Sequence, residues 1–568
     1  MKNMFRLKLI ACSLLFSANC LAQVHEKIAK ADQAFSKSDW SAYGQIYTDL
    51  VQHSPDNGEY WYRIGIAQSR FGKIDEAVNA YQRSYQIGYS KARSALRLAS
   101  LQAQLQQPQQ AVDWFVKARQ LHLVNAEQEL MQDPHLSKLV QDAKWSKVLF
   151  PMLPPDADRV SKWQTDLDFF QTRMQESHWS LFEQVEQRVW QDQIDQLRKD
   201  LSNLDDWQIK MRLNQLVRLG KSGHSLLIPE FDGDDAFHLA NLQIAAFADG
   251  WYVKSAAKEH AALVGKKVLR IGSLELGLSP DLALQRLQSA IPHETVAGLR
   301  YIGARMMLIP EYLHFFGLEK SRNQLHLSLQ DAQGAVSEIV VTTPSINMER
   351  LQKVLMSAWT PDNWTAIATT PSTPLWLQQP HRHFWFTTLK DDKLIYFQFN
   401  QVRDGDESLA DFSMRLERAL KSPSIKGLVI DVRHNNGGNG QLLEPLRQAL
   451  TRVDSLRKPG KIYVLIGGKT FSAASQFIAD IEQSLPVTFV GEMSGSGPTH
   501  VGEDNMILLP NSRTKILAAS RLFVRSFSDD YRSGIAPHIQ VVQRFSDLQN
   551  GRDTVLEAAL NDFRKQSE

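Results

Sequence analysis

Apolar and amphipathic stretches alternate over the last third of the chain. Short runs of apolar residues, each of a length that suits one buried strand, are separated by longer stretches with apolar positions at helical spacing. This alternation predicts a layered α/β core over residues 383–562. The expected strands are 395–399, 427–432, 462–466 and 487–490, and the expected helices are 409–421, 442–453 and 473–482.

Residues 23–150 have a different pattern, which is polar, rich in Gln and Ala, and helical in period. Small and aromatic residues recur there at an interval of about 34 residues, the length of a tetratricopeptide repeat. The matching positions are Trp61, Ile64, Gly65, Gly72, Ala77 and Tyr81 in one unit and Ala111, Phe115 and Ala118 in the next. The pattern predicts tetratricopeptide-like helical repeats, with a plain array of helical hairpins as the alternative.

Three further regions lie between the repeats and the core. Residues 156–229 carry apolar positions at helical spacing, which predicts a helical segment that leads into the core. Residues 230–345 contain short strand-like runs punctuated by glycine, which predicts a β-rich module. Residues 346–382 contain several Thr-Pro pairs and predict a linker.

The beginning of the chain has the pattern of a secretory signal peptide. Lys2, Arg6 and Lys8 precede an apolar stretch, and small residues follow it up to Ala22. We therefore expect residues 1–22 to be a signal peptide and the mature chain to be exported, either to the periplasm or out of the cell. A disordered or anchored N-terminus is the alternative.

Removal of residues 1–22 changes what the composition implies. Both cysteines, Cys12 and Cys20, are lost, so the mature chain has no disulfide, catalytic thiol or thiolate metal site. Three basic residues and no acidic residue are lost with them, and the formal net charge falls from +2 to −1. A near-neutral chain without basic runs gives no case for nucleic-acid binding. No later stretch reaches the ~18 apolar residues of a membrane span.

Two segments of the predicted core carry the candidate chemistry. In the first, an apolar run leads into a polar turn that contains Gly437 and Gly438. In the second, an apolar run leads to Ser472, which directly precedes a predicted helix. A serine at a strand-to-helix junction is exposed and lies beside the free backbone amides of the helix start. The amides of Ala473 and of Gly437 or Gly438 are candidates for stabilising an oxyanion, and the two segments together predict a serine hydrolase.

These segments resemble the carboxyl-terminal-processing, or tail-specific, serine proteases. That family has the pattern D-x-R-x-N-x-G-G, then S-A-x-E around the nucleophile, then G-E-x-T-x-G. This chain has Asp431-Val-Arg-His-Asn-Asn-Gly-Gly438, then Ser472-Ala-Ala-Ser475, then Gly491-Glu-Met-Ser-Gly495. The glutamate that follows the nucleophile in the family is Ser475 here. The resemblance implies that residues 383–562 are a serine protease core that acts on polypeptides without a metal or cofactor.

A second resemblance concerns residues 230–345. Residues 263–273, with a helix expected over 281–289, are similar to the carboxylate-binding loop, strand and helix of a PDZ-type domain. Such domains bind a chain end by adding it as a strand to a sheet edge. The implied fold is multidomain α+β, with N-terminal tetratricopeptide-like repeats, a PDZ-like β-rich module and a C-terminal layered α/β protease core. A generic β-rich insert is the alternative for the middle region.

A base must take the proton of Ser472, and its identity is left open by the sequence. Tail-specific proteases commonly use a lysine in the G-E-x-T-x-G-K loop, but that position is Gly497 here, and no lysine lies between Lys469 and Lys515. Tricorn-type members of the same broad family place a histidine before the core, and His224 corresponds to it. A histidine suits general-base work near neutral pH.

Alternatives remain for each candidate. His434 and His500 are rival bases, and the resemblance to tricorn-type sites makes Asp530 the candidate for orienting the histidine or binding a substrate amine. In the non-catalytic interpretation, Ser472 is only a helix N-cap. His224 is then a surface histidine, and Asp530 is part of a solvated turn. No G-x-S-x-G elbow, H-E-x-x-H motif or P-loop is present.

Two functions follow from this sequence. The first is an exported serine endopeptidase that cleaves unstructured or C-terminally presented polypeptides, with a protein partner bound by the repeats. The second is a protease-like scaffold that binds peptides or proteins without cleaving them, because the expected lysine is missing and Ser475 replaces the glutamate.

Overall fold

The computed structural model of the protein describes residues 23–231, 233, 236–277, 280–356 and 359–566. The expected signal peptide, residues 1–22, and both cysteines lie outside this range. The structure is a multidomain α+β fold that divides into two compact units. The first is Met1–Ser177 together with Asn505–Arg513, and the second is His178–Asp504 together with Thr514–Glu568.

A six-stranded sheet with the order β16-β13-β12-β11-β10-β9 forms the centre of the second unit. All neighbouring strands from β10 to β16 run parallel, and β9 pairs with β10 in the antiparallel sense. Parallel strands end at the same sheet edge, so the loops after β11 and β12 come together there. The strands are β9 (Phe384–Leu389), β10 (Leu394–Phe399), β11 (Gly427–Asp431), β12 (Ile462–Ile466), β13 (Val487–Gly491) and β16 (Ile539–Gln540).

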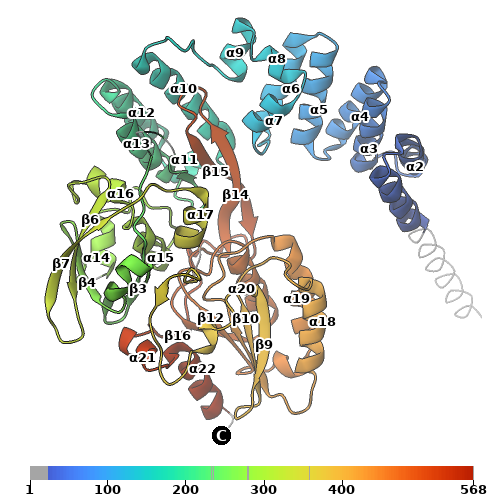
Figure 1. The fold of residues 1–568 in the computed structure, drawn as a ribbon. Helices are drawn as coiled ribbons and strands as arrows, with labels where there is room; N and C mark the ends of the chain where they lie inside the picture. Colours follow the sequence, from blue (N-terminus) through green and yellow to red (C-terminus); the bar gives the residue numbers. More distant parts are fainter. Residues whose placement is uncertain (1–22, 232, 234–235, 278–279, 357–358, 567–568) are drawn as a thin grey trace, which may run out of the picture. The chain divides into compact units, whose positions relative to one another are not determined.

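Helices cover both faces of this sheet (Figure 1). The side chains on one face, among them Phe397 and Val464, pack with α18, α19 and α20 in one apolar cluster. Tyr463 and Val490 point to the other face and pack against α22. The helices are α18 (Leu409–Leu420), α19 (Leu443–Thr451), α20 (Ala473–Ser484), α21 (Phe545–Gln549) and α22 (Thr554–Lys565). The strands and helices expected for the layered α/β core are therefore present, with ends that differ by at most two residues.

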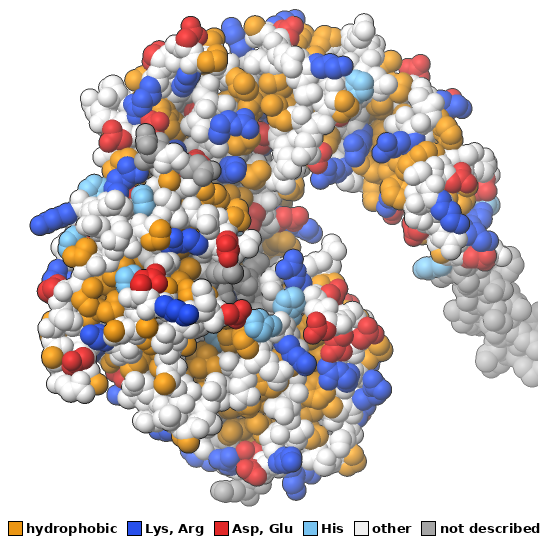
Figure 2. Space-filling model, viewed as in Figure 1, with side chains coloured by type: hydrophobic (Ala, Val, Ile, Leu, Met, Phe, Trp, Pro, Cys, Tyr) orange, Lys and Arg blue, Asp and Glu red, His pale blue; other side chains and the backbone are white. Residues whose placement is uncertain are grey.

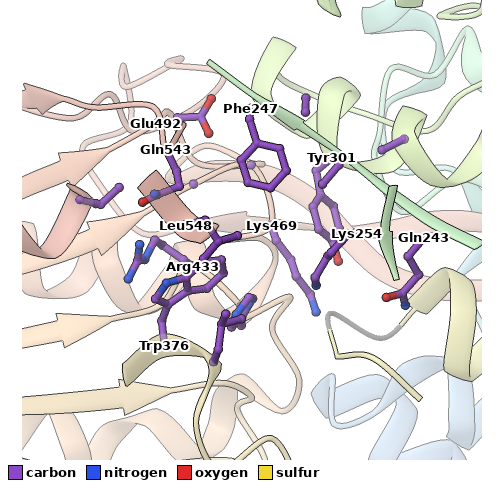
Figure 3. A pocket seen from close by; sticks show the side chains of 18 of the residues that line it. Gln243, Phe247, Lys254, Tyr301, Trp376, Arg433, Lys469, Glu492, Gln543 and Leu548 are labelled. Atoms are coloured by element: carbon purple, nitrogen blue, oxygen red, sulfur yellow. The ribbon is translucent and has the colours of Figure 1, made fainter. Parts of the chain in front are cut away.

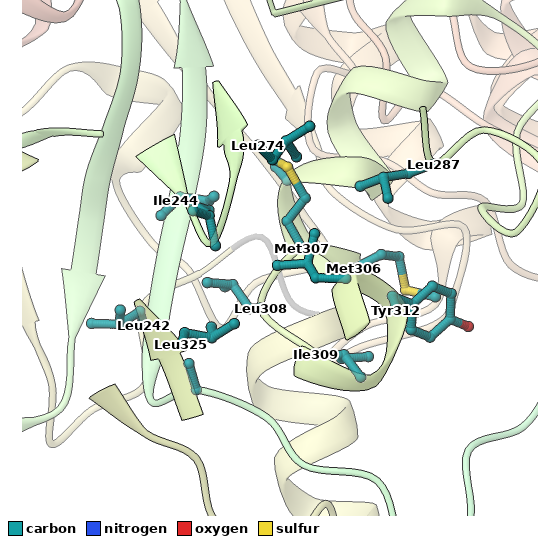
Figure 4. Packing of buried hydrophobic residues seen from close by; sticks show 14 of the residues in the cluster. Leu242, Ile244, Leu274, Leu287, Met306, Met307, Leu308, Ile309, Tyr312 and Leu325 are labelled. Carbon is teal, nitrogen blue, oxygen red and sulfur yellow. The ribbon is translucent and has the colours of Figure 1, made fainter. Parts of the chain in front are cut away.

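A second, mainly antiparallel sheet has the order β2-β3-β4-β6-β7, so β2 is an edge strand. Its apolar face packs with the neighbouring helices, and Figure 4 shows part of that cluster, including Leu242, Ile244, Met307 and Leu325. The strands are β2 (Leu242–Phe247), β3 (Gly250–Ala256), β4 (Lys267–Ile271), β5 (Leu274–Glu275), β6 (Gln324–Gln330), β7 (Val336–Thr342) and β8 (Thr365–Ala366). The helices are α14 (Pro280–Gln285), α15 (Val296–Met306), α16 (Pro310–Phe315) and α17 (Met348–Arg350).

A long hairpin of β14 (Thr499–Leu508) and β15 (Lys515–Val524) forms the third sheet together with β1 (Leu226–Leu227). The short strand β1 pairs antiparallel with β15, with Leu226 opposite Leu517. Because His224 lies two residues before β1, this pairing fixes where the histidine is held. The second unit also contains α11 (Leu181–Gln184), α12 (Gln187–Asp200) and α13 (Asp206–Arg218).

Helices make up most of the first unit, where α3 packs with α4 and α5 packs with α6. A Cβ atom on Gly65 of α3 would lie 2.8 Å from the ring of Tyr81, so the small residue permits the close approach of α3 and α4. Helix also extends over residues 23–36. The remaining helices are α2 (Trp40–His53), α3 (Gly58–Arg70), α4 (Ile74–Ile87), α5 (Lys91–Gln104), α6 (Pro108–Gln120), α7 (Ala126–Gln132), α8 (Leu136–Leu139), α9 (Ala143–Leu149) and α10 (Arg159–Ser177).

Surface charge is mixed in sign. Figure 2 shows Lys and Arg side chains interspersed with Asp and Glu over the visible face, in keeping with the near-zero net charge of the chain. In the part of the chain that the structure describes, no helix combines the length and the apolar character that crossing a bilayer requires.

Candidate active site

Ser472 occupies a strained turn between β12 and α20. Its backbone has φ 55° and ψ −126°, a conformation with positive φ that is rare for a residue with a side chain. Such strain is found at functional sites, where it directs a side chain outward. The Ser472 hydroxyl makes no capping hydrogen bond to α20, so the residue does not act as a conventional N-cap.

His224 is the residue that meets this hydroxyl. Its Nε2 lies 3.0 Å from Ser472 Oγ, although the two residues are 248 positions apart in the sequence. The imidazole stacks on Phe471, with 4.5 Å between ring centres. The backbone amide of His224 donates to Ser222 Oγ at 3.1 Å, and that hydroxyl donates to Val501 O at 2.9 Å. Contacts to the ring and to the backbone amide of His224 therefore fix its position.

The surroundings keep His224 neutral. Burial, followed by the neighbouring His500, lowers the pKa of His224 from 6.5 to about 3. An imidazole that is neutral at pH 7 is able to accept the proton of Ser472 at Nε2 only if its other proton is on Nδ1. The group beside Nδ1 therefore decides which tautomer is favoured.

Glu294 lies on that side of the ring. Its Oε1 is 4.0 Å from His224 Nδ1 and accepts the amide hydrogen of Gly223 at 2.9 Å. Burial raises the pKa of Glu294 from 4.5 to about 8, against the opposing effects of the Gly223 amide and Arg218. Arg218 in turn donates to Ser222 O and to His293 O, which ties the segments before His224 and Glu294 together.

Asp530 is placed differently. Its carboxylate accepts hydrogen bonds from Arg532 at 2.9 and 2.8 Å, and that arginine also binds Glu482. The hydrogen bonds from Arg532 lower the pKa of Asp530, against a smaller effect of burial. No hydrogen bond or ion pair between Asp530 and His224 is found among the described residues. The position beside the histidine ring belongs to Glu294 instead.

The candidate oxyanion amides are not equivalent. The Gly437 amide donates to Asn435 Oδ1 at 2.9 Å, and the Ser472 amide donates to Ser496 Oγ at 3.1 Å, so both are already used. Among the residues described, the amides of Ala473 and Gly438 donate no hydrogen bond. The geometry therefore favours Ala473 and Gly438 as the donor pair, with Gly437 as a support.

Gly437 contributes through its lack of a side chain. It has φ 102°, and a Cβ atom there would lie 2.8 Å from both Ala473 N and Ser472 Cβ. A larger residue would displace the nucleophile or block the amide beside it. The glycine turn after β11 is thus packed directly against the start of α20.

Ser475 takes part in a chain of hydroxyl groups under the nucleophile. Ser496 Oγ accepts from the Ser472 amide and donates to Ser475 Oγ at 2.9 Å, which donates to Thr470 O at 3.0 Å. These bonds connect both ends of the turn that carries Ser472. The serine at the family's glutamate position therefore has a structural contact to the nucleophile loop.

The two rival bases, His500 and His434, make other contacts. His500 stacks in parallel on His224 with 6.1 Å between ring centres, and its Nδ1 contacts Gly497 O at 2.9 Å. His434 packs against Trp359 and Trp376, with ring centres 4.5 and 5.0 Å away. In the described parts of the chain, neither histidine makes a hydrogen bond to Ser472.

The position of the family's lysine is also blocked. A Cβ atom on Gly497 would lie 2.0 Å from Arg532 O, so no side chain fits there without moving the backbone. The absence of lysine at this position is therefore built into the local packing. Within the described ranges, no group of three or more His, Cys, Asp or Glu side chains is arranged to hold a metal ion.

Sequence reasoning did not find Glu294, Arg218 or Ser496. Glu294 stands alone before the N-cap Thr295 of α15, in a region without a catalytic motif. Its role depends on the β-rich region packing against the core, which no local pattern reveals. In the sequence, a glutamate directly before the helix-capping Thr295 is only a weak signal.

No family model and no curated protein matches the chain, but solved structures do. The crystal structure of a CPAF mutant matches with a TM-score of 0.52 and 12% identity, over 71% of this chain and 97% of that chain. The structure of mature CPAF complexed with lactacystin matches with a TM-score of 0.51 and 12% identity, over 72% and 98%. The photosystem II D1 C-terminal processing protease matches over 71% and 97% at 12% identity, with a TM-score of only 0.34. The likeness to CPAF shows a shared fold and no more.

Proposed function

We propose that the protein is a serine endopeptidase of the tail-specific type, with Ser472 as nucleophile and His224 as general base. The observation that carries this proposal is the 3.0 Å contact between His224 Nε2 and Ser472 Oγ at a turn of positive φ. A nucleophile paired with a base, and a carboxyl group beside that base, is the arrangement that acyl transfer requires.

The reaction follows from the positions of these groups. Ser472 Oγ attacks the scissile carbonyl carbon while its proton passes to His224 Nε2, and the amides of Ala473 and Gly438 stabilise the oxyanion. His224 then gives the proton to the leaving amine, which frees the new N-terminus. Water attacks the acyl-enzyme with His224 as base, releases the carboxylate product and restores the serine. Glu294 stabilises the imidazolium that forms in each step.

The substrate is an unstructured or C-terminally presented polypeptide. In this proposal residues 230–345 form a PDZ-like module that binds the chain end, and residues 23–150 form tetratricopeptide-like repeats that bind a protein partner. Residues 156–229 deliver His224, and residues 346–382 connect the module to the core of residues 383–562. The pattern of residues 1–22 supports export to the periplasm or beyond.

A serine-reactive fluorophosphonate probe tests the nucleophile directly. We expect the wild-type protein to be labelled, and labelling to be lost in both Ser472→Ala and His224→Ala, because the probe requires a serine activated by its base. Circular dichroism of each variant checks that the fold is retained. Binding of a polypeptide without any labelling of the wild type would favour the second function, a protease-like scaffold, which the Ser475 replacement motivates.

Activity is expected to rise with pH through about 8, the pKa to which burial raises Glu294. Below that pH Glu294 is protonated and neutral, and above it the carboxylate stabilises the imidazolium of His224 across 4.0 Å. Because the pKa of His224 is lowered to about 3, the histidine is neutral on both sides of this transition. We expect kcat/KM to increase by about ten- to a hundredfold across it, since a charge pair at this distance is worth up to about 4 kcal/mol near a protein surface.

Glu294→Gln is the variant that checks this assignment. Its pH profile should lack the rise near pH 8, while Asp530→Asn, which changes the aspartate paired with Arg532, should keep it. The opposite result, with the rise lost only in Asp530→Asn, would return the orienting role to Asp530.

A further inference from the structure

Figure 3 shows a cavity in the second unit, lined by Gln243 of β2, Tyr301 of α15 and Lys469 among others. It lies in the region for which binding of a chain end is already proposed. The first unit has a hollow of about 720 Å³, whose walls come from α6 and α9. None of the proposed catalytic residues lines this hollow, which is called the α6–α9 groove from here on.

Helix α6 has apolar side chains on two opposite faces. Ala111, Phe115 and Ala118 are buried on the first face, where α6 packs with α5. The second face lines the groove with positions at helical spacing, which are 109, 112, 113, 116, 117 and 120. Val112 and Val116 are the apolar residues of this second face. Apolar residues at this spacing suit packing with another helix.

The helix stack of the first unit covers this second face only in part. From α3 to α6, each helix packs with the next, as in stacked helical hairpins, where each unit covers the face of the unit before it. Helix α9 packs beside α6, but it has seven residues against thirteen in α6. The groove is the part of the face that remains, so an added helix would continue the stack.

The other wall of the groove consists of side chains from α9. Trp145 is largely buried, whereas 46% of Val148 is exposed. Arg119 of α6 donates to Val148 O at 3.2 Å, which ties the two walls together. Because the walls are already held in place, little of the free energy of binding is lost in ordering them.

Three lysines lie around this apolar surface. The ammonium of Lys144 lies 4.0 Å from the ring centre of Trp145. The ammonium groups of Lys117 and Lys91 lie 5.3 and 5.8 Å from the ring centre of Tyr85. Within the described ranges, none of the three lysines forms an ion pair with a carboxylate. The three ammonium groups are therefore available to acidic groups of a partner.

One carboxylate also lines the groove. Asp113 accepts a hydrogen bond from Gln109 Nε2 at 3.0 Å, so it is engaged with its neighbour on α6. Three positive charges around the groove thus stand against one negative charge. This balance favours a partner whose polar groups are acidic.

We propose that the α6–α9 groove binds an amphipathic helix of a protein partner, with an apolar stripe flanked by acidic residues. The stripe packs on Val112, Val116 and Val148, and the acidic residues meet the three lysines. A helix fits because α6 offers apolar residues at helical spacing, and acidic flanks fit because the lysines outnumber Asp113. The inference rests on the proposal that residues 23–150 bind a protein partner, and it does not depend on catalysis.

A partner bound in this way is held by an internal segment. The face of a helix binds through its side chains and not through a terminal carboxylate, so both ends of the partner chain remain free. A polypeptide recruited by the groove is therefore still able to present its C-terminus to the module of residues 230–345. The groove selects a helical acidic segment, whereas the module selects a chain end.

Fluorescence anisotropy on the full chain carrying Ser472→Ala tests the proposal without cleavage of the probe. Three labelled peptides of equal length are compared. The first has a stripe of Leu at helical spacing with Glu flanks, the second has the same stripe with Lys flanks, and the third is the Glu-flanked sequence interrupted by two prolines. We expect the Glu-flanked helix to bind at least about tenfold more tightly than either of the others at low ionic strength.

Val148→Glu places a negative charge at an exposed position of the groove, and it should weaken binding of the Glu-flanked helix by at least about tenfold. Met131→Glu is the matched control, because Met131 is an exposed apolar residue of α7 outside the groove. It should leave the affinity unchanged. Circular dichroism of both variants checks that the fold is retained.

Reversal of charge is a second and independent measurement. In the double variant with Lys117→Glu and Lys144→Glu, the preference should reverse, so that the Lys-flanked helix binds more tightly than the Glu-flanked one. Lys37→Glu with Lys138→Glu is the matched control, at two exposed lysines outside the groove, and should keep the original preference. This pair of variants decides the question if Val148→Glu does not fold.

Equal affinities for the Glu-flanked and Lys-flanked helices, or undiminished binding in Val148→Glu, would overturn the proposal. Equally tight binding of the proline-containing peptide would show that an extended chain occupies the groove instead. Self-association of the wild type in sedimentation velocity, if lost in Val148→Glu, would assign the groove to a second copy of this chain. Fluorophosphonate labelling of Val148→Glu should match that of the wild type, so failure of this inference is separable from failure of the peptidase proposal.

Discussion

Ser472→Ala is expected to lower kcat/KM for an unstructured polypeptide by at least about 10⁴-fold. The substitution removes the hydroxyl oxygen that lies 3.0 Å from His224 Nε2. No covalent intermediate forms without it, and the amides of Ala473 and Gly438 are left to stabilise an attack by water alone. Cleavage of a fluorogenic, disordered peptide under single-turnover conditions is the measurement.

The control for this variant lies on the same helix. Ser484→Ala changes an exposed serine at the last residue of α20, whose hydroxyl donates only to Asp480 O. It should retain full activity, which separates loss of the nucleophile from disturbance of the helix. Retention of cleavage in Ser472→Ala would mean that another residue is the nucleophile.

His224→Ala is expected to cause a loss of similar size, about 10⁴-fold or more. Without an acceptor at Nε2, the Ser472 hydroxyl keeps its proton and is a weak nucleophile near neutral pH. The double variant with Ser472→Ala should be no slower than either single variant, because the two side chains act as one unit. Additive losses would contradict a shared catalytic step.

His500→Ala is the comparison that distinguishes the base from its neighbour. Its ring is parallel to that of His224 at 6.1 Å but makes its contact to Gly497 O. We expect a loss of less than about tenfold, through packing against His224. A loss as large as that of His224→Ala would make His500 part of the proton transfer.

Local patterns were enough to predict β10 to β13 and α18 to α20, whereas β9, β16 and α22 were not predicted. Apolar runs such as Ile462–Ile466 are buried on both faces, and their ends coincide with β12. The turn that holds Ser472 was also predictable, because the residue stands between an apolar run and a stretch with helical spacing. The conformation of Ser472 itself, with φ 55°, was not predictable, since the turn lies against Gly437, which is distant in the sequence.

The partners of the nucleophile were harder to derive. His224 was suggested by a family resemblance, and its distance from Ser472 depends on the pairing of β1 with β15, a contact between distant segments. Asp530 was suggested by the resemblance to tricorn-type sites, yet Arg532 occupies its carboxylate. Glu294 comes from the β-rich region, where no motif in the sequence pointed to an acid for catalysis. Long-range contacts of this kind leave no trace in spacing or composition.

The pairing of Leu226 with Leu517 has a further consequence for how the proposed active site is assembled. His224, the proposed base, lies in the first half of the chain, and Ser472, the proposed nucleophile, lies in the second half. The two-residue strand β1 helps to bring them together. A nascent chain, or a fragment produced by a cut between Leu226 and Ser472, therefore holds one chemical partner without the other. Under the proposed function, cleavage therefore requires the completed fold, and a chain that is still being synthesised does not cleave other polypeptides.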